Sequence, residues 1–173
     1  MVCVAYFTSY ATNNVSAEWV CDSLVSGDNG TMQTKDWLTM TAKGGYECGA
    51  FRYAVDGEPK AVVVCHCTHC QRQSGSAFGM SMVIGSDKFH VVQGELASFS
   101  RPADSGNTLI CYFCPHCGTR IYNQKQGGAA VVILKPGTLD DPKSVTPGRQ
   151  LWASEKQNWV NLLELPSFEQ QPG

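Results

Sequence analysis

The feature that most constrains this chain is a group of three cysteines within six residues, Cys65, Cys67 and Cys70, in the pattern C-x-C-x-x-C. Thiolates this close repel one another unless a cation lies between them, and zinc binds several thiolates from one tight loop at about 2.3 Å. Three sulfurs leave the fourth tetrahedral position open, which is typical of catalytic rather than structural zinc. The pattern therefore predicts an open zinc site.

A second group of cysteines is spread along the chain. Cys48 stands alone, whereas Cys114 and Cys117 form a C-x-x-C pair that is followed by Gly118, the arrangement of a zinc-knuckle turn. His116 lies inside this pair, where we expect a turn residue rather than a ligand. Structural zinc sites have four protein ligands, so these cysteines indicate a second, closed site.

Other interpretations of the first group stay open. A purely structural zinc would take its fourth ligand from His66, His69 or another cysteine. An iron–sulfur cluster is also conceivable, although it usually requires a fourth cysteine in a recognised spacing. If neither histidine is a ligand, we expect both to point outward or to hydrogen-bond the backbone, and a role in proton transfer is a lesser alternative.

Composition indicates one globular domain. The chain has 173 residues, of which 43% are hydrophobic and 16% charged, so it can form a proper core. A net charge of −2 without a basic stretch argues against a nucleic-acid partner, and no apolar run is long enough to cross a membrane. Nine cysteines, several of them clustered, and an N-terminus without a basic region favour a reducing, cytoplasmic location over secretion.

The first 43 residues differ in character from the rest of the chain. The apolar spacing over residues 15–24 allows one short helix, and we find no chemistry beyond the isolated Cys3 and Cys21. We therefore expect residues 1–43 to be an extension that packs loosely on the domain and is partly disordered, and residues 44–173 to be the zinc-binding β domain.

The pattern from Gly44 onward is that of β-structure. Phe51, Tyr53 and Val55 alternate with less apolar residues, which predicts a half-buried strand. Many short strands separated by turns indicate an all-β, sandwich-like domain. Further strands are expected at residues 61–65, 79–84, 89–93, 96–101, 108–113, 119–123 and 129–134, and residues 151–154 and 159–163 are expected to be short final segments.

Two features of this β pattern indicate how strands are placed in the sheets. The strands at 89–93 and 96–101 are separated by Gly94, which predicts that they form a hairpin. The strand at 129–134 is apolar throughout, which predicts a central position in its sheet.

Four motifs, in this order, resemble the glutathione-dependent formaldehyde-activating enzyme family, to which centromere protein V belongs. The resemblance covers about residues 44–170. The motifs are Gly44 to Tyr53 (G-x-C-x-C-G-x-x-R-Y in the family), Cys65 to Phe78 (C-x-C-x-x-C followed by G-S-x-F), Phe113 to Thr119 (F-C-x-x-C-G-T), and Gly137 to Pro142 (G-T-L-D-D-P) with Trp152 and Trp159.

The resemblance implies an Mss4-like fold of packed antiparallel β-sheets with zinc-binding loops, and two zinc ions. Cys65, Cys67 and Cys70 correspond to the ligands of the catalytic zinc. Cys48, Cys114 and Cys117 correspond to three of the four ligands of the structural zinc.

Tyr46 departs from the family pattern, because the family has a cysteine at this position. A phenol is a poor ligand for structural zinc. Cys111, three residues before Cys114, or Cys3 or Cys21 from the extension would restore a fourth ligand. Alternatively, the second zinc has been lost.

The activity that the resemblance implies is the reversible joining of glutathione and formaldehyde into S-hydroxymethylglutathione, a carbon–sulfur lyase reaction. The expected partners are therefore a small-molecule thiol and an aldehyde. At an open zinc site the thiol would ionise and attack the carbonyl carbon, or zinc would polarise the aldehyde oxygen. Three thiolates and Zn²⁺ carry a net charge of −1, which weakens the second role and favours the first.

Substrate contacts are expected just after the first cysteine group. Arg72, Ser74 and Ser76 offer donors for the carboxylates of a glutathione-like substrate. The alternative is that residues 74–76 form a tight turn and Arg72 is a surface charge. For Trp152 and Trp159 we expect core or interface packing rather than substrate stacking.

Two functions therefore stay open from the sequence. The first is a zinc-dependent carbon–sulfur lyase, which the intact C-x-C-x-x-C pattern favours. The second is a non-catalytic, zinc-stabilised binding or scaffold module of the same fold, which the replacement at Tyr46 favours if it has emptied the second site. The sequence indicates no oligomeric state.

Overall fold

The computed structural model describes residues 2–6, 18–22, 42–162 and 164–171. The chain divides into two compact units, residues 1–32 and 33–173. In the first unit, β1 (Val2–Tyr6) pairs antiparallel with β2 (Glu18–Asp22). The helix predicted near residues 15–24 is therefore wrong over 18–22, where Trp19 and Val20 favour a strand once an antiparallel partner is available. The rest of the predicted extension, residues 1, 7–17 and 23–41, lies outside the described residues, as do the side chains of Cys3 and Cys21.

The second unit consists mainly of short strands, which confirms the predicted mainly β class. One α-helix, α2, lies among the described residues, together with four 3-10 turns. The elements are β3 (Ala42–Gly45), β4 (Arg52–Val55), β5 (Ala61–Cys65), α2 (Thr68–Ser74), β6 (Gly79–Gly85), η1 (Ser86–Lys88), β7 (Phe89–Gln93), β8 (Ala97–Pro102), β9 (Thr108–Phe113), β10 (Arg120–Lys125), β11 (Val131–Leu134), η2 (Pro136–Thr138), η3 (Pro142–Ser144), β12 (Arg149–Leu151), η4 (Ala153–Glu155) and β13 (Ser167–Phe168).

The strands of this unit form two sheets. The larger has the order β13-β12-β5-β6-β11-β10-β9-β8, and the smaller has the order β3-β4-β7. Most neighbours are antiparallel, but β12 runs parallel to both β5 and β13, so the larger sheet is mixed at that edge rather than wholly antiparallel. β11 lies between β6 and β10, which confirms the central position predicted from its apolar sequence.

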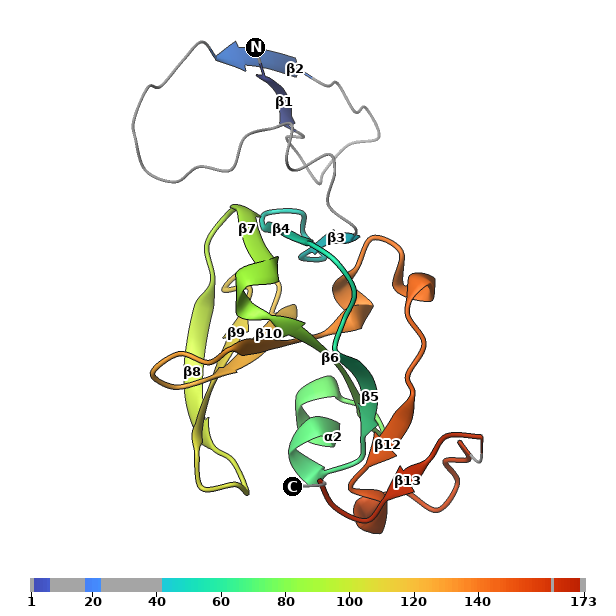
Figure 1. Ribbon diagram of the computed structural model, residues 1–173. Helices are drawn as coiled ribbons and strands as arrows, with labels where there is room; N and C mark the ends of the chain where they lie inside the picture. Colours follow the sequence, from blue (N-terminus) through green and yellow to red (C-terminus); the bar gives the residue numbers. More distant parts are fainter. Residues whose placement is uncertain (1, 7–17, 23–41, 163, 172–173) are drawn as a thin grey trace. The chain divides into compact units, whose positions relative to one another are not determined.

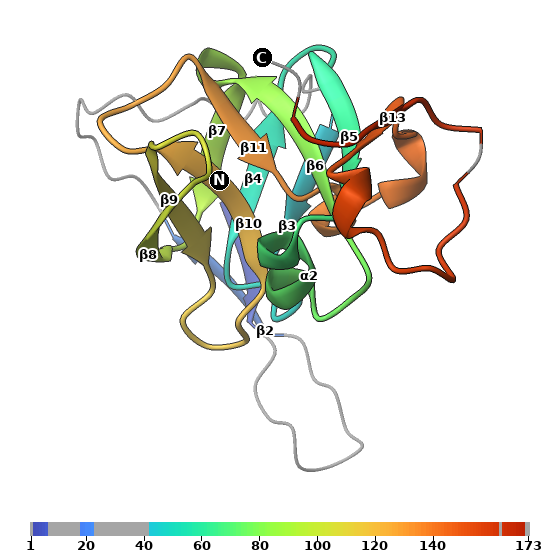
Figure 2. The ribbon, with the colours of Figure 1, turned by 90° about the horizontal axis from the view of Figure 1, so that it is seen from below.

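The two sheets pack face to face around one core. In Figure 2, β4 and β7 lie behind β11 and β6, so the sheets form two layers. Phe51 and Tyr53 from the smaller layer are fully buried and belong to the same cluster as Met82, Ile84 and Leu134 of the larger. The end of β5 and the start of β6 lie side by side, and α2 lies beside them (Figures 1 and 2).

The predicted hairpin about Gly94 is wrong. β7 pairs with β4 in the smaller sheet, whereas β8 pairs with β9 in the larger sheet. The chain changes layers at Gly94, which has a φ of +84° and approaches the smaller layer so closely that a Cβ would lie 2.1 Å from the carbonyl oxygen of Ala50. A glycine that is needed for a close backbone approach resembles a hairpin turn in sequence.

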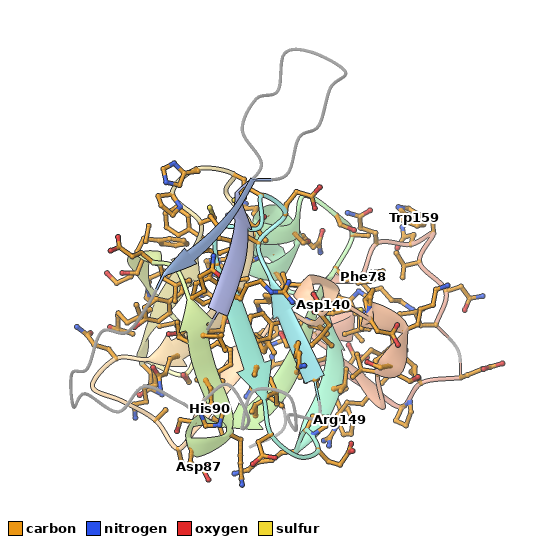
Figure 3. The ribbon with its side chains drawn as sticks, turned by 90° about the horizontal axis from the view of Figure 1, so that it is seen from above. Phe78, Asp87, His90, Asp140, Arg149 and Trp159 are labelled. Carbon is orange, nitrogen blue, oxygen red and sulfur yellow. The ribbon has the colours of Figure 1, made fainter. Side chains whose placement is uncertain are left out.

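The two short segments expected near the C-terminus are mostly not strands. β12 ends at Leu151, where the first segment begins, residues 153–155 form a 3-10 turn, and residues 159–162 are not a strand. Trp159 is 74% exposed and its indole N–H donates to Gln157 Oε1 at 2.8 Å, so it does not pack in the core, and Figure 3 shows it at the periphery. Among the described residues, no helix is both long and apolar enough to cross a membrane.

Candidate metal centres and active-site cavity

The first cysteine group lies where β5 gives way to α2. Cys65 ends the strand, Cys67 is the N-cap of the helix and Cys70 is in its first turn. The three Sγ atoms lie within 4.8 Å of one another, and the backbone N–H of Cys70 donates to Cys67 Sγ at 3.4 Å. Cys65 and Cys67 are buried and Cys70 is partly buried. We call these three residues the inner triad. Their spacing and the amide donor fit a zinc–thiolate site.

Glycines allow the inner triad to close. Gly75 ends α2 in the left-handed region with a φ of 60°, which only glycine adopts without strain. Gly79 at the start of β6 lies against Cys70, where an added Cβ would be 3.2 Å from the Cys70 Cβ. The tight turn expected at residues 74–76 is therefore the end of a helix that the sequence did not reveal.

A segment near the C-terminus fixes the start of α2. The Gln71 side-chain amide donates to the carbonyl oxygens of His66 at 2.6 Å and Glu155 at 3.0 Å. The Glu155 carboxylate accepts the backbone N–H of Thr68 at 2.6 Å, and Gln157 Nε2 donates to Gln71 Oε1 at 3.0 Å. These bonds hold a helix of only seven residues, which would not be stable alone.

His66 is fully buried, so the expectation that it points outward is wrong. Its Nε2 lies 3.1 Å from Gln150 Oε1. Gln150 Nε2 donates to the carbonyl oxygens of Leu162 and Leu165, so Gln150 Oε1 must accept and His66 Nε2 carries the proton. No nitrogen of His66 or of the partly buried His69 joins the inner triad within the described structure, which argues against a histidine as its fourth ligand.

A cavity of about 380 Å³ opens beside the inner triad. Cys70 is on its wall, and Lys135 and Arg120 also line it. Lys135 follows β11 and Arg120 begins β10, so the cavity gathers side chains from distant parts of the chain. The remaining lining residues are Gln73, Ser74, Gly79, Met80, Gly118, Thr119, Pro136, Gly137 and Thr138.

The two cations in this cavity have no acidic partner among the residues that the structure describes. Lys135 Nζ donates to Ser81 Oγ at 3.2 Å, and Arg120 donates to Gln73 Oε1. Neither forms a salt bridge within the described part of the chain, and the buried Arg120 Nε has no hydrogen-bond partner there. Burial, followed by the Arg120 charge, lowers the pKa of Lys135 to about 8. The cavity therefore presents positive charge to a bound molecule.

The inner triad is prepared to carry negative charge. Hydrogen bonds from Cys65 and Cys67, assisted by the Lys135 and Arg120 charges, lower the pKa of Cys70 to about 3. The same hydrogen bonds raise the pKa of Cys65, because the proton that it shares with its neighbours is held more tightly. One thiolate is thus already favoured at Cys70, on the wall of the cavity.

The residues predicted to contact substrate are only partly in this cavity. Ser74 lines it, and its Oγ contacts the carbonyl oxygens of Gln71 and Phe78. Arg72 and Ser76 are exposed and are not among the lining residues. Sequence reasoning missed Lys135 and Arg120. The available signal was a lone lysine directly after an apolar strand and an arginine two residues after the Gly118 of the knuckle.

The second cysteine group also comes together. The Sγ atoms of Cys48, Cys114 and Cys117 lie within 4.8 Å of one another, and Cys48 and Cys117 are exposed. We call these residues the outer triad. The backbone N–H groups of His116 and Cys117 each donate to Cys114 Sγ at 3.4 Å, which confirms His116 as a turn residue. Backbone donors aimed at sulfur fit a zinc–thiolate site here as well.

Comparison with known proteins identifies the family. The family model for the glutathione-dependent formaldehyde-activating enzyme matches residues 41–155. The chain belongs to this family. No curated protein matches the sequence. A crystal structure of a Rhodobacter sphaeroides protein from a structural genomics programme is similar at 17% identity and a TM-score of 0.45, covering 73% of this chain and 98% of its own.

Membership of the formaldehyde-activating family indicates an enzyme-like role in glutathione and formaldehyde chemistry. The two triads are the groups of three or more potential ligands among the described residues. The predicted zinc chemistry therefore has two candidate centres, of which only the inner triad has a residue on the wall of the cavity that contains Lys135 and Arg120.

Cys111 does not join the outer triad, although it is only three residues from Cys114. It is buried in β9, and Gln73 Nε2 donates to its Sγ at 3.8 Å. Its charge would act on Arg120 and Lys135, on the side of the inner triad. The structure thus brings Cys111 toward the other site, and any role as a substitute ligand for the outer triad would require it to move.

The Tyr46 side chain makes contacts away from the outer triad. Its hydroxyl donates to the carbonyl oxygen of Glu95 at 3.1 Å, and its ring centroid lies 4.8 Å from that of Phe51 in the core. Burial, with the nearby charges of the outer triad, raises the pKa of the Tyr46 phenol. A neutral phenol that donates its proton to a carbonyl is not available as a zinc ligand.

Proposed function

We propose that this protein is a zinc-dependent carbon–sulfur lyase that makes or breaks a thiol–aldehyde adduct such as S-hydroxymethylglutathione. The observation that carries the proposal is the inner triad, with Cys70 on the wall of a cavity that also contains two cations without an acidic partner in the described structure. Three sulfurs from one turn offer a tetrahedral zinc ion one open position, and that position is needed for a substrate.

The inner triad would hold zinc through Cys65, Cys67 and Cys70. Zinc bound there would supply an open position at which a substrate thiol ionises at neutral pH. The cavity then limits where the aldehyde can lie, and proximity is the main contribution required, because thiols add to aldehydes readily in water. The fixed helix start and the buried His66–Gln150 pair keep the sulfurs in place while substrates exchange.

The bonds that change are simple. The thiol sulfur forms a bond to the carbonyl carbon, the π-electron pair of the carbonyl moves to its oxygen, and this oxygen takes the proton that the thiol has released. Lys135 and Arg120 line the same cavity and would stabilise the negative oxygen as it forms. The reverse reaction uses the same residues in the opposite order.

We propose the remaining parts of the site from position and chemistry. Ser74 inside the cavity, with the exposed Arg72 and Ser76 at the same end of α2, would contact the carboxylates of a glutathione-like thiol. The outer triad would hold a second zinc that supports the fold. A cytoplasmic location, where small thiols are reduced, is consistent with this chemistry.

Exchange spectroscopy tests the proposal directly. At equilibrium between [13C]formaldehyde, glutathione and their adduct, the zinc-loaded protein is expected to accelerate interconversion of the two carbon signals. Cys67→Ser should give the rate measured in buffer, with an unchanged circular dichroism spectrum. Equal acceleration by the variant would contradict the proposal, and no acceleration by either protein would favour a non-catalytic module.

A further inference from the structure

The outer triad has three sulfurs and no fourth protein ligand among the described residues. No histidine, aspartate or glutamate of the described chain joins Cys48, Cys114 and Cys117 in one group. The Tyr46 phenol lies close enough to interact electrostatically with all three sulfurs, but its hydroxyl donates a hydrogen bond to the carbonyl oxygen of Glu95. Zinc binds tetrahedrally at such a site, so one position must be filled from elsewhere.

Two cysteines of the outer triad are exposed to solvent. Cys48 and Cys117 are exposed, as are their neighbours Glu47, Gly49 and His116. The inner triad differs, because Cys65 and Cys67 are both buried. A ligand from solution therefore reaches the outer triad without any movement of the chain.

The surroundings of the outer triad favour sulfur. The Thr119 hydroxyl, which accepts the backbone N–H of Glu47, lies 3.1 Å from Cys117 Sγ and can donate its own hydrogen to that sulfur. Two backbone donors point at Cys114. Donors of this kind offset the negative charge of several thiolates on one ion, which would otherwise disfavour a fourth.

We propose that the outer triad is an open, solvent-accessible zinc site whose fourth ligand is an exchangeable small thiol from solution, with water bound when no thiol is present. The site would thus be neither closed by Cys111 nor lost. This inference concerns metal coordination and does not rest on turnover at the inner triad.

The test uses the full chain with Cys67→Ser to weaken the inner triad, loaded with one equivalent of zinc and measured by zinc X-ray absorption. In thiol-free buffer we expect three sulfurs at about 2.3 Å and one oxygen or nitrogen at about 2.0–2.2 Å. Saturating 2-mercaptoethanol should convert this to four sulfurs. Failure of the thiol to add a sulfur would overturn the ligand class.

Tyr46→Cys is the matched variant, because it creates the same C-x-C spacing that Cys65 and Cys67 already have. In the Cys67→Ser background it should give four sulfurs without added thiol, and 2-mercaptoethanol should then have no effect. Four sulfurs before this substitution would overturn the proposal. Cys111→Ser and the pair Cys3→Ser with Cys21→Ser would then identify the ligand from the chain.

A second measurement covers the case in which Cys67→Ser does not fold. The otherwise unmodified chain with two zinc ions should average three sulfurs per zinc in thiol-free buffer, and Tyr46→Cys should add one sulfur shared between the two ions. An average that already equals that of Tyr46→Cys, or a chain that binds only one zinc, would overturn the proposal.

Discussion

Each triad consists of three cysteines, but the two triads lie in different environments. The inner triad is built from a strand end and a helix, has two buried cysteines and lies beside a cavity with two cations. The outer triad joins the chain near β3 to a turn between β9 and β10, and two of its cysteines are exposed. The comparison shows that the same kind of ligand set can lie in environments that differ in burial, charge and surrounding space.

Removing one sulfur from each triad is expected to have the largest effects and tests whether the two triads differ in function. Cys67→Ser is expected to abolish acceleration of adduct exchange while the fold is kept, because the inner triad lies at the end of a sheet whose core does not depend on it. The exchange spectrum and a thermal melt measure the two effects. A variant that unfolds, or one that retains activity, would remove the distinction between the triads.

Cys114→Ser is the matched change in the outer triad. Cys114 is buried within the main hydrophobic core, so losing both its packing and the zinc should lower the free energy of unfolding by more than about 4 kcal/mol. Urea unfolding in the presence of zinc measures this value. If the loss were no larger than for Cys67→Ser, the outer triad would not be the structural site.

Lys135→Met removes a positive charge that lies beside the inner triad, and so tests whether this charge contributes to the exchange reaction. We expect the catalysed exchange rate to fall by about 10²–10³-fold, as for the loss of one donor to a developing oxyanion. Lys125→Met is the control, because Lys125 is exposed at the far end of β10 and should leave the rate unchanged. A similar fall in both variants would indicate a general charge effect.

The pH dependence of the catalysed exchange rate is a second test of Lys135, with a smaller expected effect. The pKa of Lys135 is about 8, below its ordinary value of 10.5, so its positive charge is present below pH 8 and is lost as the pH rises further. Catalysed exchange, corrected for the buffer rate, should decline above about pH 8. Lys135→Arg should keep its charge and move this decline to higher pH. An unchanged profile would exclude Lys135 as the source of the decline.

The smallest expected effect concerns the support of the inner triad. Gln150→Leu leaves the buried His66 Nε2–H without an acceptor, which should cost about 1–3 kcal/mol in the free energy of unfolding. A denaturation curve measures it, and Gln124→Leu on β10 gives a comparison outside this network. No difference between the two variants would mean that water replaces Gln150.

Local patterns predicted much of the fold. The strands expected at 61–65, 89–93 and 108–113 have the same limits as β5, β7 and β9, because apolar and β-branched runs bounded by turn residues depend on nearby sequence. Strand pairing does not depend on nearby sequence alone, so the predicted pairing of β7 was wrong. α2 was missed because its seven residues carry no apolar stripe and are held by Glu155 and Gln157, more than 80 residues away.

The candidate site was predictable to the same degree. Both triads follow from cysteine spacing and from the family motifs. Lys135 and Arg120 could not be found in this way, because a cation next to an apolar strand becomes part of a site only when the sheet brings β10 and β11 beside Cys70. The predicted contacts at Arg72 and Ser76 relied on nearness in sequence to the cysteines and lie outside the cavity.

Zinc content per chain, measured by elemental mass spectrometry on protein purified without added metal, tests the central claim of two separate metal centres. We expect two zinc ions in the native chain and the loss of one in each of Cys67→Ser and Cys114→Ser. A single zinc in the native chain that either variant abolishes, or no zinc at all, would contradict it.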